Sequence, residues 1–254
     1  MANDEGRTNS SPVSFHKEIR PLLQANCNGC HQPAKAKGDY IMTDFTSLLS
    51  GGESEKPAVV PGKPDQSYLI EEVTPDENGE YEMPKGKNAK PLHATEIRLL
   101  RRWIEEGAKD DSPVGSVSTY TMDNPPTYTM PPVVTSMDFS SDGTLLAVTG
   151  FHEALIHKAD GSGLVARLVG LSERIESVSF SPDGKKLGIT GGQPGRMGEV
   201  QIWDVEKKKL ELSKAVTFDT LYGGAWSKDG KYFAFGAANS DGYDHIKSLG
   251  LNTF

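Results

Sequence analysis

Cysteine is almost absent from this sequence of 254 residues: there are two, and they lie three positions apart. Two cysteines this close cannot cross-link distant parts of the chain, which argues against the disulfide framework of small secreted domains. Long hydrophobic runs are also missing, and the mean hydropathy is -0.48. No stretch approaches the roughly 18 apolar residues that indicate a membrane-spanning helix. We therefore expect no transmembrane segment.

An excess of basic residues is missing too. The chain has 27 lysines and arginines against 35 aspartates and glutamates, which gives a net charge of -8. Residues 1–111 hold 14 basic and 19 acidic side chains, and the remainder holds 13 and 16. Because binding to a phosphate backbone needs a basic face, neither half is expected to bind nucleic acid.

The first part of the chain has helical patterns over short stretches. Four apolar residues fall on one helical stripe, namely Phe15, Ile19, Leu22 and Leu23. Pro21 lies among them and predicts a kink or two short helices that meet there. A helix is also expected from Thr95, as N-cap, to Gly107, as a left-handed stop, and a weaker one over Gln66–Val73. These patterns predict a small all-α domain over residues 13–111, preceded by a flexible tail over 1–12.

The composition then changes twice. Residues 112–132 are rich in Ser, Thr and Pro, which predicts a linker. From residue 133 onward the apolar residues have the spacing of β-strands. A unit of two strands joined by an Asp-Gly turn occurs three times. The turns contain Asp142, Asp183 and Asp229, which lie 41 and 46 residues apart. The fold class expected is therefore two domains, one all-α and one all-β.

The repeats resemble those of the Trp-Asp repeat β-propeller family. Trp203 and Asp204 stand where the dipeptide of that family closes the third strand of a blade, and the repeat length of ~40 to 45 residues agrees. The resemblance implies about two and a half blades within residues 133–254, with the last fifteen or so residues irregular. Closed propellers have about 4 to 8 blades. We therefore expect an incomplete propeller that continues in further sequence or binds another protein.

The two cysteines belong to the motif Cys27-Asn28-Gly29-Cys30-His31. Two thiols at this spacing can each reach one vinyl group of the same porphyrin, and the next imidazole can then bind the iron. Asn28 and Gly29 suit the tight loop between the thiols. The motif predicts one covalently attached haem c, with His31 as an axial ligand.

Other interpretations of the cysteine pair remain open. A zinc site needs four ligands, and beyond His31 the first half offers only His16 and His93, with no second cysteine pair. A redox-active disulfide of the thioredoxin kind would need a βαβ context, which the pattern does not indicate. Coincidence is the third alternative.

Met83 is the candidate for the sixth iron ligand. It stands in a loop roughly fifty residues after the motif and just before the last predicted helix, and Pro84 would stiffen that loop. A thioether favours ferrous iron and raises the reduction potential, as suits an electron carrier. His93, which would lower the potential, and Met42 are the alternatives.

Several motifs in order resemble the planctomycete-type cytochrome c domain over about residues 13–110. They are Phe15 to Leu23, Asn26 to His31, Gly62 to Leu69, Met83-Pro84, and Glu96 to Ala108. The resemblance implies haem c binding, often in a chain with Trp-Asp repeats. One departure is that Lys85 follows Pro84, where members commonly have a second proline.

An acidic stretch precedes Met83. Between residues 71 and 82 there are six carboxylates and no basic residue: Glu71, Glu72, Asp76, Glu77, Glu80 and Glu82. We call this stretch the acidic rim. A solvated loop explains it, and so does a surface that steers a basic redox partner protein toward the haem edge. Lys85, Lys87 and Lys90 follow directly and would place positive charges beside the negative charges of the rim.

The sequence predicts an electron-transfer protein with a propeller docking region, and no catalysis at the iron because both axial positions would be filled. A haem-based redox or gas sensor and a small peroxidase-like enzyme are the alternatives, each needing an open iron face.

Haem c attachment in bacteria takes place outside the cytoplasm, whereas Met1 to Pro12 is polar and has no apolar signal region. We therefore expect a periplasmic or otherwise extracytoplasmic protein whose signal peptide is not part of this sequence.

Overall fold

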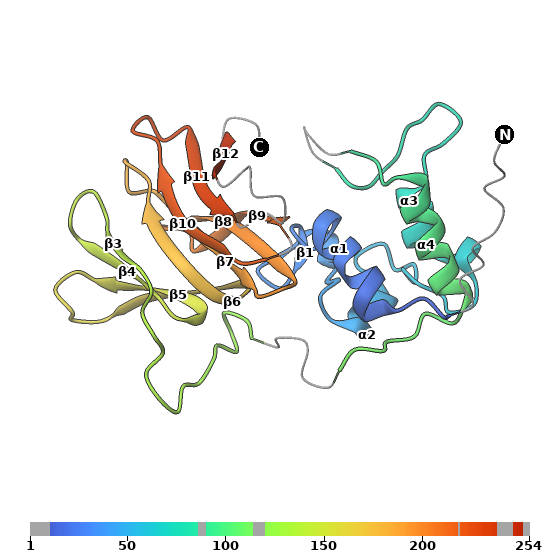
Figure 1. The fold of residues 1–254 in the computed structure, drawn as a ribbon, viewed down its shortest axis with the longest axis horizontal. Coiled ribbons are helices and arrows are strands. Elements are labelled where there is room, and N and C mark those ends of the chain that lie inside the picture. The colour runs from blue at the N-terminus through green and yellow to red at the C-terminus, as the bar shows by residue number, and fades with distance from the viewer. Residues whose placement is uncertain (1–10, 86–89, 114–119, 218, 238–245, 251–254) are drawn as a thin grey trace.

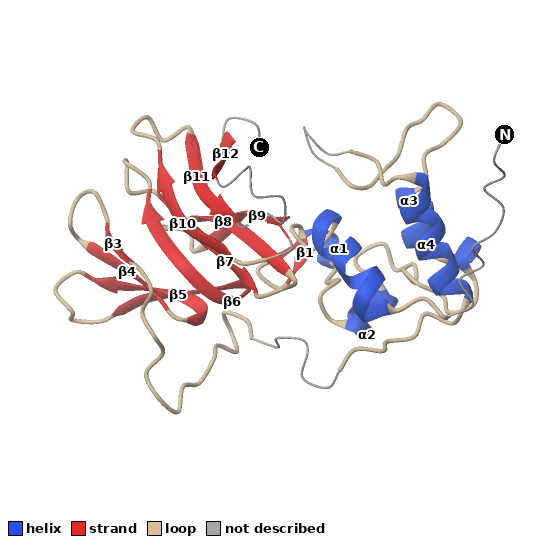
Figure 2. Ribbon diagram, in the orientation of Figure 1, coloured by secondary structure: helices blue, strands red, loops and turns tan. Residues whose placement is uncertain are grey.

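The computed structural model describes residues 11–85, 90–113, 120–217, 219–237 and 246–250 (Figure 1). Helices gather in the first part of the chain and strands in the second (Figure 2). Most of the expected tail, six residues of the expected linker, Lys87 and most of the last fifteen residues lie outside the described residues. Among the described helices, none combines the length and the apolar character needed to span a bilayer.

The helices of the first part are short. They are the π-helical turn η1 (Phe15–Ile19), α1 (Arg20–Asn26), the 3₁₀ turns η2 (Lys37–Asp39) and η3 (Pro64–Gln66), α2 (Phe45–Ser50), α3 (Tyr68–Val73) and α4 (Ala94–Glu105). A two-stranded ladder of β1 (His31–Gln32) and β2 (Lys35–Ala36) lies among them.

The expectation of an all-α domain followed by propeller blades is wrong as a fold class. The chain is mostly β-sheet, and the first part holds a β-ladder and long loops besides its short helices. The physical reason is the spacing of helix breakers: glycine and proline recur between residues 51 and 64, so helical periodicity never extends far there. The sheets of the second part are nevertheless consistent with β-blades.

The helix boundaries differ from those expected in two respects. The helix expected over Gln66–Val73 begins at Tyr68, and the N-cap of α4 is another residue than expected. His93, not Thr95, is the N-cap of α4: its side chain accepts from the backbone N–H of Thr95, and Glu96 reaches back to the N–H of His93. A histidine ring can fill this role, although Ser, Thr, Asp and Asn are the usual caps. The stop at Gly107 is confirmed, with φ of 101°. Two short helices, η1 and α1, meet directly before Pro21, and Ile19 and Arg20 at the junction both have right-handed helical backbone angles.

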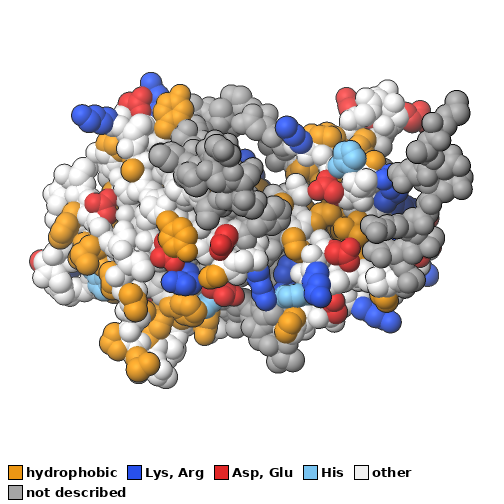
Figure 3. Space-filling view, in the orientation of Figure 1, with side chains coloured by type: hydrophobic (Ala, Val, Ile, Leu, Met, Phe, Trp, Pro, Cys, Tyr) orange, Lys and Arg blue, Asp and Glu red, His pale blue; other side chains and the backbone are white. Residues whose placement is uncertain are grey.

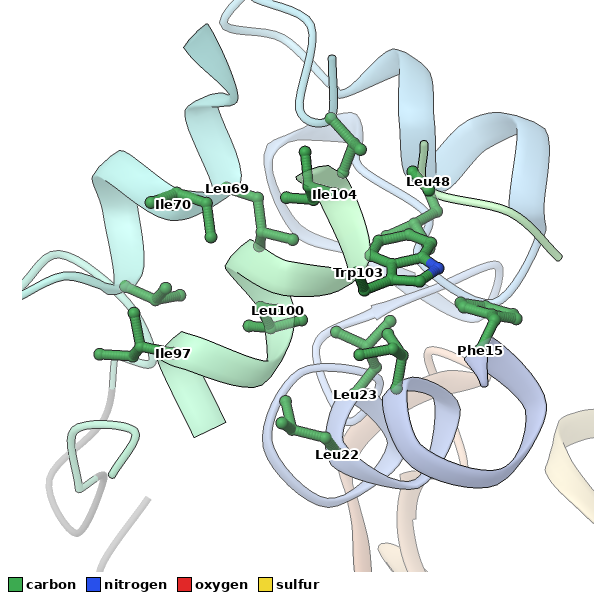
Figure 4. Close-up of a cluster of buried hydrophobic side chains, with 14 of the residues drawn as sticks. Phe15, Leu22, Leu23, Leu48, Leu69, Ile70, Ile97, Leu100, Trp103 and Ile104 are labelled. Carbon is green, nitrogen blue, oxygen red and sulfur yellow. The ribbon is translucent and has the colours of Figure 1, made fainter. Parts of the chain in front are cut away.

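A single cluster of buried apolar side chains holds the first part together (Figure 4). Trp103 of α4 is at its centre and is 1% exposed. Its ring stacks on Phe15 at 5.4 Å between centroids and meets Phe45 edge-on at 6.3 Å. The indole N–H donates to the carbonyl of Lys109 at 3.0 Å. This contact satisfies the one polar atom of the largest core side chain.

The described residues of the second part form two antiparallel sheets. The first has seven strands in sequential order: β3 (Met137–Phe139), β4 (Leu145–Thr149), β5 (Phe151–Lys158), β6 (Leu164–Phe180), β7 (Lys186–Gln193), β8 (Met197–Asp204) and β9 (Lys209–Thr217). The second has three: β10 (Leu221–Trp226), β11 (Tyr232–Ala237) and β12 (Ile246–Gly250). β12 falls in the stretch that was expected to be irregular.

The three repeated turns join β3 to β4, β6 to β7 and β10 to β11, as the repeat predicts. In each turn a serine hydroxyl donates to the turn aspartate at 2.6 Å; the three pairs are Ser140–Asp142, Ser181–Asp183 and Ser227–Asp229. The glycine after each aspartate has φ near 70°, a conformation that disfavours side chains with a Cβ. The same residues thus build the same turn three times.

The strand β6 joins the first two repeats without a break. Its first half pairs with β5 and its second half with β7, so both repeats share one sheet. β10 of the third repeat packs on β6 and β7. Phe233 is fully buried there, beside Gly188 and Gly224, where a Cβ would overlap its ring. The two glycines therefore make room for the aromatic side chain between the sheets.

Part of the segment that was expected to be a linker is hydrogen-bonded to β5. The hydroxyl of Tyr128 donates to the carbonyl of Phe151 at 2.6 Å and to the buried Glu153 at 2.8 Å. Arg167 forms a double contact with Glu153, at 2.7 and 2.8 Å, and also reaches the carbonyl of Pro126. Burial and the Glu153 carboxylate raise the pKa of the Tyr128 phenol, which keeps it protonated as a donor.

Candidate haem-binding site

The cysteine motif forms a helix-like turn at the end of α1. The N–H of Cys27 still donates to Leu23, and the carbonyl of Cys27 accepts from the N–H groups of Cys30, at 3.0 Å, and His31, at 3.2 Å. Residues separated by three and four positions in such a turn lie on one face. The backbone therefore directs the two thiols and the imidazole to the same side, as the attachment motif requires.

Backbone contacts hold the imidazole of His31 in place. Its Nδ1 lies 3.3 Å from the carbonyl of Tyr40. A carbonyl only accepts, so Nδ1 is the donor in a hydrogen bond between these two atoms, and the ring has a second backbone hydrogen bond with Lys37. The tautomer with its proton on Nδ1 is one that binds metals through Nε2. The carbonyl of His31 in turn accepts from the N–H of Met42 at 2.9 Å. Burial lowers the pKa of His31, which favours the neutral ring.

The thiols face a cavity of about 320 Å³. Its walls include the candidate ligands that the sequence singles out, namely Cys27, Cys30, His31, Met42 and Met83. A volume of this order is within the range of small-molecule and cofactor sites, which are concave and mostly apolar. Both cysteines are free and partly buried, and burial is the main cause that raises the pKa of Cys27 to about 12.

Met83 reaches this cavity because its loop is tied to α3. The N–H of Met83 donates to the carbonyl of Glu72, the penultimate residue of α3, at 2.8 Å. Pro84 and Lys85 also line the cavity, and Lys85 forms an ion pair with Glu82 at 2.7 Å. The loop is thus fixed at its base and contributes Met83, Pro84 and Lys85 to the wall of the cavity.

The competing candidates are placed differently. His93 is exposed, caps α4 because its Nδ1 accepts from the backbone N–H of Thr95 at 3.3 Å, and does not line the cavity. Met42 is buried and does line it. Within the described residues, no three His, Cys, Asp or Glu side chains converge in a way that could hold a bare metal ion. Of the two competing candidates, Met42 lies at the cavity and His93 does not.

The acidic rim has cationic neighbours at several places. Glu71 lies 3.5 Å from Lys56, and Glu82 pairs with Lys85. Glu72, which lines the cavity, accepts from the hydroxyl of Tyr68 and is the main cause that raises the pKa of this phenol to about 12. Positive and negative charges thus lie side by side near the cavity. Of the lysines that follow the rim, Lys85 forms such a pair.

Two features of the site have no signal in the sequence. The carbonyl that orients His31 belongs to Tyr40, nine residues further on, and any residue type could supply it. Gly29, which does not line the cavity, lies against β9, where a Cβ would overlap the carbonyl oxygen of Ser213. Neither contact follows from residue types or spacing, because both depend on how the chain packs.

One similarity to known proteins concerns the first part of the chain. Residues 27–86 match the family model described as planctomycete cytochrome C. This match covers the cysteine motif, the acidic rim and Met83 but less than half of the chain.

A second similarity is to the human protein described as U3 small nucleolar RNA-associated protein 18 homolog. The two are 32% identical over 107 residues, which are 41% of this chain and 18% of the human protein. The chain thus spans less than a fifth of the length of that relative.

Proposed function

We propose that residues 13–111 bind one haem c and that the chain is an electron-transfer protein. Cys27 and Cys30 would form the two thioether links, and His31 and Met83 would be the axial ligands. The observation that carries the proposal is the shared cavity: two free thiols, the imidazole of His31 and the thioether of Met83 all line it. The match to the planctomycete cytochrome C model agrees with this chemistry.

When bound, the haem would supply a one-electron couple between ferrous and ferric iron. The residues of the chain set the conditions for this couple. The carbonyl of Tyr40 orients His31 and makes its imidazole a better donor. The loop that is hydrogen-bonded to Glu72 would present Met83 to the haem. A thioether ligand favours the ferrous state and raises the potential.

The remaining parts of the proposal concern location and the second half of the chain. Covalent haem attachment implies that the protein matures outside the cytoplasm. Residues 133–254 would belong to a Trp-Asp repeat propeller and serve as a docking region. The repeated Ser-Asp-Gly turns and the antiparallel sheets support this interpretation.

The direct test is to export the chain in a host that attaches haem c and to measure its mass and absorption spectrum. We expect a mass increase of one haem and a weak deep-red band in the ferric state, typical of methionine ligation. The Met83→Ala variant should keep the added mass and lose the band, whereas the matched Met42→Ala variant should keep both. Colourless protein with the mass of the bare polypeptide would refute haem binding, and loss of the band only in Met42→Ala would refute Met83 as the ligand.

We further propose that the acidic rim steers a basic redox partner. The rate of electron transfer to a small cationic redox complex should fall between roughly 10 and 150 mM salt, as the Debye length shortens from about 30 Å to about 8 Å. A Glu77→Gln/Glu80→Gln variant should weaken this dependence, and the exposed Glu206→Gln variant in the second part should not. A rate that does not vary with salt would remove the steering role.

A further inference from the structure

The strand β9 ends the seven-stranded sheet, so one of its edges has no strand beside it among the described residues. An edge strand offers unpaired backbone N–H and C=O groups, which can recruit another strand and cause aggregation. Proteins commonly protect such edges by a bulge, a charged side chain or a covering segment. β9 has all three.

The bulge is at Glu211. Leu212 pairs with Ile202 and Leu210 with Trp203, so Glu211 has no partner residue on β8. A bulge interrupts the regular ladder and twists the edge away from a flat template. The side chain of Glu211 is held on the sheet by Lys186 at 2.7 Å.

The covering segment is the haem-attachment motif itself. Gly29, between the two cysteines, lies so close to β9 that a Cβ would overlap the carbonyl oxygen of Ser213. Lys35 of β2 donates its ammonium N–H to the carbonyl of Glu211, at the bulge. Both α1 and β2 contact β9, and Figure 1 shows α1 and β1 beside this end of the sheet.

The contact continues into the interior of the sheet. The hydroxyl of Ser213 donates to Glu199, a fully buried carboxylate that also accepts from Ser172 at 2.6 Å and Gln201 at 2.8 Å. The indole of Trp203 donates to Gln201 at 2.8 Å. The strand against which Gly29 packs is therefore fixed from behind by a hydrogen-bonded network and is not free to move away.

We propose that the β9 edge is a docking surface whose occupant is this chain's own segment from Cys27 to Ala36. The haem-attachment turn covers the edge permanently and holds the attached group at a fixed position relative to the sheet. The two halves of the chain are then one unit and not two modules on a flexible linker. The statement about the haem position rests on the proposed function, whereas the docking rests only on protein contacts.

The test uses Gly29→Ala in the full exported chain. Gly29 is not in the left-handed region, so alanine adds a Cβ against Ser213 without backbone strain and leaves both cysteines and His31 in place. Gly163→Ala is the matched control, because it too has an ordinary φ and nothing lies within 4 Å of the added Cβ. Lys35→Met removes the second contact and retains most of the side-chain volume.

The measurement is amide hydrogen exchange of peptides that cover residues 209–217, with peptides from β4 as an internal reference. We expect exchange in β9 to rise about tenfold in Gly29→Ala and in Lys35→Met, with β4 unchanged and haem still attached. Gly163→Ala should match the wild type. Unchanged β9 exchange in both docking variants would overturn the proposal. If even the wild type carries no haem, the proposed function fails, but the same comparison on the haem-free chain still decides the docking.

Discussion

A Cys27→Ser/Cys30→Ser variant, exported under conditions that load the wild type, is expected to carry no covalent haem. Serine hydroxyls do not form thioether links, so the mass should equal that of the bare polypeptide. Serine is close to cysteine in size, and both positions are only partly buried, so the fold should survive the change. The expected loss of covalent haem is therefore complete.

Comparison with single variants at Met83 and His31 separates the covalent attachment of haem from the binding of its iron. Met83→Ala leaves both thiols and His31 in place, so it should retain the full haem mass and change only the spectrum. His31→Ala removes the group that the Tyr40 carbonyl orients, and it should shift the spectrum much further than Met83→Ala. Covalent haem in the double serine variant would show that attachment does not use these thiols.

Trp103→Ala is expected to lower the free energy of unfolding by about 3–5 kcal/mol, the range for removing a large aromatic side chain from a core. The side chain is 1% exposed, stacks on Phe15 and satisfies its N–H at Lys109. Alanine leaves a cavity between α4 and η1, the elements that support the attachment motif. Urea unfolding followed by far-ultraviolet circular dichroism measures the change.

Two further variants identify the cause of this loss. Trp103→Phe keeps an aromatic ring against Phe15 but leaves the Lys109 carbonyl without its donor, so it should cost less than Trp103→Ala. Tyr222→Ala removes an aromatic side chain that is 52% exposed, and surface changes of this kind usually stay within about 0.5 kcal/mol. If Trp103→Ala costs no more than Tyr222→Ala, Trp103 is not the centre of this core.

The sequence alone predicts the turns and the arrangement of side chains that are close together along the chain. The spacing of Cys27, Cys30 and His31 predicts one turn that directs all three to one side, because positions three and four apart share a face. The Asp-Gly pairs predict three tight turns, because few residues tolerate φ near 70°. Gly107 predicts the end of α4 for the same reason. Each prediction depends on only a few neighbouring residues.

The all-α expectation failed where the sequence is least periodic. Between the helical stretches, glycine and proline indicate loops but do not say where those loops go. In the structure, the loops bring Met42 and Met83 to the walls of one cavity, and His31 pairs with Ala36 in a β-ladder. No local pattern indicates these arrangements.

The sequence by itself determined which groups can attach a porphyrin and where the chain must turn, because both depend on residue chemistry and spacing over a few positions. Only the tertiary structure decided that the carbonyl of Tyr40 orients His31 and that Gly29 meets Ser213. The second contact joins residues 184 positions apart. Such a meeting depends on how all the intervening elements pack, and the free energy of that packing is spread over the whole chain.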